Sequence, residues 1–171
     1  MATVNNLIFV LTLLTALGCG LIAGVFFGFS SFIMTALGRV QPSQGIASMQ
    51  SINIVVINPV FLGVFLGTAI LCAVLVIFSL LNWSTPGSAW LLAGGLLYFF
   101  GTFVVTMAFN VPLNNALAAV DPASAEGARV WENYLSVWTI WNTVRTIGAL
   151  AGMAALIVGL VYRSSPTVIS N

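Results

Sequence analysis

The chain has 171 residues, of which 60% are hydrophobic and only 4% are charged, and its formal net charge is +1. Soluble domains carry roughly a quarter charged residues, so this composition excludes a soluble domain and predicts an integral membrane protein in contact with membrane lipid. The small net charge gives no indication of nucleic acid as a partner, and none is expected.

Four stretches are apolar over lengths sufficient to cross a bilayer core, which takes about 20 residues. In chain order they are residues 7–37, 59–81, 89–109 and 143–162. The second and third are joined by a short turn rich in helix breakers, NWSTPGS, whereas long mixed segments join the other pairs. The sequence therefore predicts a single membrane domain over residues 1–171. Its expected fold is all-α: an antiparallel four-helix bundle with short interfacial helices in the two long loops.

Glycine recurs at four-residue spacing in the first, second and fourth spans. Lipid gives helices no hydrophobic reason to associate, so close backbone approach at small residues becomes important for their packing. These repeats therefore predict tight contacts between spans inside the bundle. The residues concerned are Gly20, Gly24, Gly28, Gly63, Gly67, Gly148 and Gly152.

Polar residues gather where the spans meet the two long connections, which share one side because alternate loops of a four-span bundle do so. Asn58 precedes Pro59, a pattern typical of a helix cap followed by proline at the first helical position. A contribution of Asn58 to a ligand pocket is the alternative. Ser30 and Met34, near the end of the first span, reach the same side and extend the polar ring.

Three asparagines surround the proline that is expected to end the third span. Pro112 follows Asn110 by two residues, and amides on both sides of a proline can satisfy the freed backbone groups. Capping alone would need one asparagine, but the segment also contains Asn114 and Asn115. A pocket role for Asn110 and Asn114 is therefore equally compatible with the pattern.

A stripe of aromatic and polar residues precedes and enters the fourth span. At about 100° per residue, this stripe, which includes two of the glycines, covers roughly a third of the helix circumference. That estimate requires a helix that is continuous from a cap at Asp121 and a first helical residue at Pro122. If the glycines mark the interior, Arg145 points inward as well; the alternative is an arginine that snorkels to the membrane interface. The stripe comprises Trp131, Tyr134, Trp138, Trp141, Asn142, Arg145, Gly148 and Gly152.

The residue types restrict the chemistry that the pocket can perform. The chain has no histidine, which excludes haem bound through histidine and the usual metal sites, and it has no glycine-rich phosphate loop. Its three acids are too dispersed for a paired-carboxylate mechanism, so no metal and no cofactor is expected. An apolar, aromatic-lined pocket with amide and guanidinium donors suits a flat hydrophobic ligand that carries carbonyl or phenol oxygens.

Four segments in this order resemble the anthrone oxygenase family of small four-span membrane proteins: GLIAGVFFGFSSFIMTAL, MQSINIVVINPVF, GTFVVTMAFNVPLNNALAAVDP and WENYLSVWTIWNTVRT. The resemblance implies oxidation of an anthrone to an anthraquinone without a recognised cofactor. Two positions depart from the family pattern, since members often have histidine in place of Thr143 and proline in place of Thr35. Without that histidine, the most obvious general base is missing.

Together these features predict a membrane oxygenase that binds a small hydrophobic polycyclic phenol or anthrone-type ligand and oxidises it with dioxygen, without metal or flavin. The expected catalytic residues are Arg145, Asn110, Asn114 and Asn142. The expected ligand-binding residues are Trp138, Trp141, Tyr134, Asn58, Ser30 and Met34. The alternative is a non-catalytic membrane protein: a carrier of a lipophilic ligand, a subunit or an assembly factor. The oligomeric state is left open.

The arginines give an expectation for orientation in the cell membrane. Arg39, Arg129 and Arg145 lie on the side of the long loops, whereas Arg163 alone lies on the other. Because cytoplasmic loops carry an excess of positive charge, the long loops are expected in the cytoplasm and both termini outside.

Overall fold

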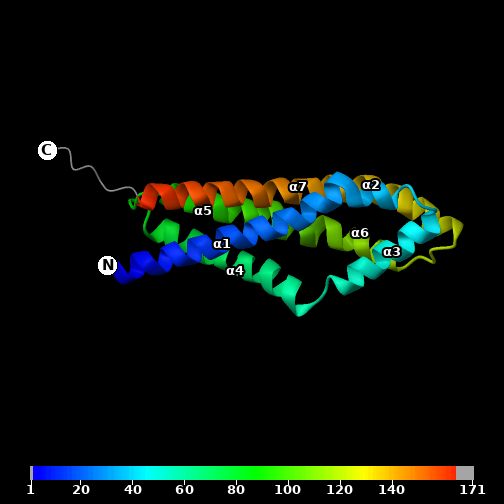
Figure 1. The fold of residues 1–171 in the computed structure, drawn as a ribbon, viewed down its shortest axis with the longest axis horizontal. Coiled ribbons are helices and arrows are strands. Elements are labelled where there is room, and N and C mark those ends of the chain that lie inside the picture. Colours follow the sequence, from blue (N-terminus) through cyan, green and yellow to red (C-terminus); the bar gives the residue numbers. More distant parts are fainter. Residues whose placement is uncertain (1, 165–171) are drawn as a thin grey trace.

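The structure, a computed structural model, describes residues 2–164 and is helical, with no strand in that range (Figure 1). In chain order the elements are α1 (Ala2–Gly28), η1 (Phe29–Ile33), α2 (Met34–Leu37), α3 (Pro42–Val55), α4 (Pro59–Leu81), α5 (Ser88–Tyr98), η2 (Phe99–Val104), η3 (Thr106–Asn110), α6 (Val111–Ala118) and α7 (Ala125–Ser164). The three η elements are π-helical turns inserted into longer helices.

Four continuous helices are long and apolar enough to cross a membrane, at residues 6–37, 59–81, 88–118 and 125–164. Each contains one of the four apolar stretches predicted from the sequence. The prediction of an all-helical membrane protein is confirmed.

The longest helix, α7, organises the packing. Both α1 and α5 pack along α7, and α4 packs against α5 and α1, so the four long helices enclose a common interior. The N-terminal end of α1 and the end of α7 lie at one end of the molecule, and both long connections lie at the other (Figure 1). The polar segments where the spans meet the two long connections therefore lie at the same end of the molecule.

Two apolar clusters hold this arrangement. The larger joins α1, α4, α5 and α7 through buried residues such as Cys19, Leu75 and Tyr98. The smaller, at the end with the long connections, packs α3 against α6 and α7 through Ile46, Met49 and neighbouring side chains. The second cluster therefore holds α3 against α6 and α7, beside the four long helices.

The first long connection contains the expected short helix, α3, but the second does not contain a separate one. The third long helix continues through η3 into α6, so Pro112 does not end it, contrary to prediction. A proline removes a backbone donor and crowds the preceding turn. The π-helical turn immediately before Pro112 changes the hydrogen-bonding register there, which accommodates the proline without a break.

The predicted packing role of the glycines is confirmed in α7 and wrong for others. A Cβ atom added to Gly148 would lie 2.8 Å from the backbone of Gly101, and one added to Gly152 would lie 3.1 Å from the carbonyl oxygen of Gly94. By contrast, a Cβ atom added to any of three other glycines would meet nothing within 4 Å: Gly24, Gly63 and Gly67. Four-residue spacing aligns glycines on one face, but it does not say whether that face turns inward.

Two helix starts were predicted, of which one is confirmed. The Asn58 side chain accepts hydrogen bonds from the backbone N–H groups of Val60 and Phe61, both at 3.0 Å, and so caps α4. The predicted start at Asp121 and Pro122 is wrong, because α7 begins at Ala125. Its cap is Ser124, whose hydroxyl accepts from the N–H of Gly127 at 2.9 Å, while Asp121 stabilises the preceding turn.

Candidate functional site

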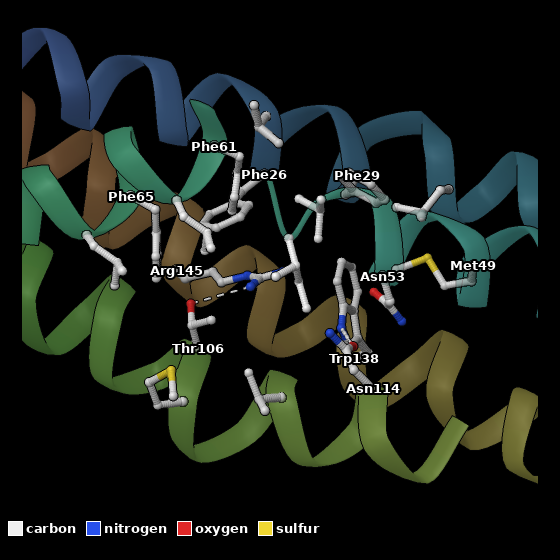
Figure 2. Close-up of a pocket in the computed structure, with 18 residues that line it drawn as sticks. Phe26, Phe29, Met49, Asn53, Phe61, Phe65, Thr106, Asn114, Trp138 and Arg145 are labelled. Atoms are coloured by element: carbon white, nitrogen blue, oxygen red, sulfur yellow. Dashed lines mark hydrogen bonds between the residues drawn. The ribbon is translucent and has the colours of Figure 1, made fainter. Parts of the chain in front are cut away.

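A cavity of about 340 Å³ lies where α4 meets α3 and faces α1, η3 and α7 (Figure 2). Most of its wall is apolar and aromatic, and its polar residues are Asn53, Thr106, Asn114 and Arg145. The cavity reaches the outer surface of the bundle, since two of its lining residues, Leu66 of α4 and Met107 of η3, are exposed.

Among the described residues that line this cavity, Arg145 alone is charged. Its side chain is only 5% exposed, so it points inward, as the stripe on α7 predicts, and does not snorkel to the surface. Its guanidinium lies over the rings of Phe26, at 3.9 Å from the centroid, and Trp138, at 4.9 Å. The cation thus contacts two aromatic rings, and such contacts stabilise an arginine away from water.

Asn142 fixes the orientation of this guanidinium. The amide oxygen of Asn142 accepts from Nε of Arg145 at 3.0 Å and from Nη2 at 2.8 Å. The amide nitrogen donates to the carbonyl oxygen of Phe26 at 2.7 Å and to the Ser30 hydroxyl at 2.6 Å. Asn142 therefore ties α7 to α1, and it acts on the cavity only through Arg145.

A second polar group enters the cavity from α6. The amide oxygen of Asn114 accepts from the Tyr134 hydroxyl and from Nε1 of Trp138, both at 2.7 Å. These two bonds fix which end of the amide is the acceptor, and they leave the Asn114 nitrogen without an acceptor among residues 2–164. Asn114 lines the cavity and thus has a neutral hydrogen-bond donor that no described residue uses.

Among the residues that the structure describes, no carboxylate pairs with Arg145 to balance its charge. The three acids of the chain, Asp121, Glu126 and Glu132, are all exposed, and Arg145 makes no ion pair within residues 2–164. Removal of a charged group from water costs several kcal/mol even after the protein relaxes around it. Arg145 is therefore a buried cation that only neutral oxygens and aromatic faces stabilise.

The remaining predicted residues lie outside the cavity wall. Asn110 is completely buried and donates to the backbone oxygen of Trp138 at 3.2 Å, while its amide oxygen has no partner within residues 2–164. Trp141 stacks on Phe109 with ring centroids 3.7 Å apart. Asn58 caps α4, and Met34 packs in the smaller apolar cluster.

Thus six of the predicted residues come together in one hydrogen-bonded or stacked group: Arg145, Asn142, Ser30, Trp138, Tyr134 and Asn114. The sequence did not reveal several other residues of the wall, among them Phe26, Asn53, Phe61, Phe65 and Thr106. For Phe61 and Phe65, the four-residue spacing that places both on one face of α4 was an available signal. For Thr106, whose hydroxyl lies 3.4 Å from Nη1 of Arg145, the sequence offered no such signal.

Within residues 2–164, no group of three or more cysteine, aspartate or glutamate side chains is placed to hold a metal ion. The polar atoms around the cavity are amide, hydroxyl and guanidinium groups, most of which are hydrogen-bond donors. This set suits a ligand oxygen with partial or full negative charge.

Comparison with known proteins identifies the family of this chain. The family model for anthrone oxygenases matches residues 61–155, more than half of the chain, and the matched region includes Asn114, Trp138, Asn142 and Arg145. No curated protein and no solved structure matches the chain. The chain therefore belongs to the anthrone oxygenase family, and an oxygenase-like function is supported at the level of that family.

Proposed function

We propose that this protein binds a hydrophobic polycyclic phenol or anthrone-type compound in the cavity and oxidises it with dioxygen, without metal or flavin. The observation that carries the proposal is one buried guanidinium at the wall of an otherwise mostly apolar, aromatic-lined cavity. The volume of about 340 Å³ lies at the lower end of the range for small-molecule pockets. It suits a compact ligand of fused rings.

The proposed reaction converts a ring CH₂ group into a ketone. Loss of one proton from the CH₂ group gives an enolate, which transfers one electron to dioxygen to form a carbon radical and superoxide. These combine and take up the proton to give a hydroperoxide, and loss of water leaves the carbonyl. The sum is CH₂ plus O₂ to C=O plus H₂O. Arg145 and Asn114 would stabilise the negative enolate oxygen, while Asn142 would position Arg145.

A second candidate function is binding without reaction, as expected of a carrier, subunit or assembly factor. The observation that favours it is the absence of histidine and carboxylate side chains from the cavity wall, where a general base would have to lie. The carrier would retain the same ligand class, because the wall chemistry is the same.

The proposed orientation places both long connections in the cytoplasm of a cell membrane. Arg39 follows α2 and Arg129 lies near the start of α7, and both are exposed beside the long connections, whereas Arg163 lies near the C-terminal end of α7. Because Arg145 is buried beside the cavity, it does not contribute to the charge of a loop. Two arginines against one favour cytoplasmic long loops.

The test of the proposed function is oxidation of an anthrone by the purified protein in detergent under air. Quinone should form faster than in buffer, and Arg145→Ala should lower the enzymatic rate about 100-fold, because loss of one donor to an oxyanion costs about 3 kcal/mol of barrier. Equal rates with wild type, with Arg145→Ala and without protein would refute catalysis. Ligand binding with no turnover would instead support the second candidate function.

A further inference from the structure

We infer that the cavity binds its ligand as a monoanion, an ionised phenol or enol whose oxygen pairs with the Arg145 guanidinium. The inference takes its ligand class from the proposed function and extends it: the protein selects acidic ring compounds, and neutral compounds of the same shape bind more weakly. Three features of the site lead to this conclusion.

The first feature is the set of hydrogen-bond donors that Arg145 leaves unused. A guanidinium has five N–H groups. Nε and Nη2 each donate to the amide oxygen of Asn142, and Nη1 makes one long contact of 3.4 Å to the Thr106 hydroxyl. Two N–H groups therefore have no acceptor among residues 2–164, although the side chain lines the cavity (Figure 2). An oxygen with two or three lone pairs would satisfy both.

The second feature is the missing counter-charge. The cavity is lined from α1, η1, α3, the α3–α4 connection, α4, η3, α6 and α7, and the only charged side chain among these lining residues is Arg145. The Tyr134 hydroxyl, which is titratable but is not in the wall, donates to Asn114 and accepts from Asn53. A bound anion would supply the only negative charge at the site. An opposite charge this close lowers the pKa of a bound acid by about 1 to 3.

The third feature is the lack of a proton acceptor in the cavity wall, which has neither histidine nor carboxylate. Charge pairing with Arg145 removes the need for one. The ligand hydroxyl would dissociate into the bound oxyanion and a proton, and the proton would pass to bulk water as the ligand binds. Ionisation would then be driven by the guanidinium and not by a side-chain base.

The experiment uses 2-hydroxyanthraquinone as the probe, because its visible absorption shifts to longer wavelength on ionisation. Its methyl ether, which has nearly the same shape and cannot ionise, is the matched control. The probe is titrated with pH in detergent alone and with excess full-length protein. With wild type, the pKa of the bound hydroxyl should fall by about 1 to 3, and the ether should bind at least ten-fold more weakly than the probe.

The matched variants are Thr106→Asp and Thr106→Asn, which have similar size but differ in charge. Thr106→Asp would place a carboxylate beside Nη1 of Arg145 and supply the missing counter-charge within the protein. Its affinity for the probe near neutral pH should be at least ten-fold below that of Thr106→Asn, and the pKa of any bound probe should return towards its value in detergent.

An unchanged or raised pKa of the probe in wild type, equal affinity for the ether, or no binding of the probe would each overturn the inference. The comparison of probe and ether on wild type decides the question even if Thr106→Asp does not fold. Failure of the proposed function has a different signature: the pKa of the probe falls on binding, but an anthrone is not oxidised. Oxidation of the anthrone with no such fall would leave the proposed function intact and refute the monoanion.

Discussion

Arg145 shows how a single side chain can combine three contacts that no other residue type offers together. Its Nε and Nη2 atoms converge on one amide oxygen of Asn142, Nη1 reaches Thr106, and its flat face lies over Phe26 and Trp138. An ammonium group is a point charge that cannot form this fork or stack in the same way. The role of Arg145 should therefore depend on guanidinium geometry as well as on charge.

At this scale we predict that Arg145→Lys weakens binding of 2-hydroxyanthraquinone nearly as much as Arg145→Ala, by about ten-fold or more, since charge-assisted hydrogen bonds contribute about 1.5–3 kcal/mol each. Both variants should still fold, because the packing glycines of α7 are unchanged. Affinity and melting temperature in detergent measure the two effects. Wild-type affinity in Arg145→Lys would show that charge alone is enough.

Among the helices, α7 determines the geometry of the site because it packs against the first and third long helices and contributes both Trp138 and Arg145 to the cavity wall. Its close approach to the third long helix occurs where Gly148 meets Gly101. The contact lies one turn from Arg145, and the hydroxyl of Thr102 donates to the Arg145 carbonyl oxygen at 2.9 Å beside it. Loss of this approach would move Arg145 relative to Thr106.

Gly148→Ala is accordingly predicted to destabilise the protein by about 1–3 kcal/mol, the usual cost of overpacking, because its Cβ atom would lie 2.8 Å from backbone that cannot rotate away. Gly63→Ala is the matched control: its Cβ atom would meet nothing within 4 Å, and alanine favours helix by roughly 0.5–1 kcal/mol. Thermal unfolding in detergent should show a lower midpoint for the first variant and an equal or higher one for the second. The reverse order would refute the proposed packing role of Gly148.

For the molecule as a whole, the cavity and both long connections belong to the same half, since α3 and α6 contribute to its wall (Figure 1). The orientation of the bundle therefore decides from which side of the membrane water and protons reach the polar residues. The proposed orientation opens that half towards the cytoplasm.

We predict that a reporter enzyme fused after Asn171, of a kind active only outside the cytoplasm, is active. A reporter that is active only in the cytoplasm should give signal when inserted in the long connection between Ala118 and Ala125, and not when fused after Asn171. Replacement of Arg39 and Arg129 by glutamine should weaken this preference, because it removes the charge asymmetry of the loops. Cytoplasmic activity of the fusion after Asn171 would reverse the assignment.

The sequence by itself determined the features that depend on local spacing and composition. Charge content and apolar lengths identified four membrane-crossing helices, and the helical period placed Trp138, Asn142 and Arg145 on one inward face of α7. The cap of α4 at Asn58 was also predictable, because it depends only on residues three positions apart. Each of these properties is fixed within one helix, so no knowledge of its neighbours is required.

Only the tertiary structure decided which helices complete the cavity. Asn142 bonds to Phe26, 116 positions away in the chain, and Arg145 reaches Thr106, 39 positions away. Helical periodicity gives the direction of a side chain about its own axis but not the rotation of the neighbouring helix. For that reason Trp141 and Asn110, predicted for the site, lie outside its wall, and Phe26, Phe61 and Thr106, which were not predicted, line it. The pairing of a buried guanidinium with only neutral partners is likewise a property of how the helices pack.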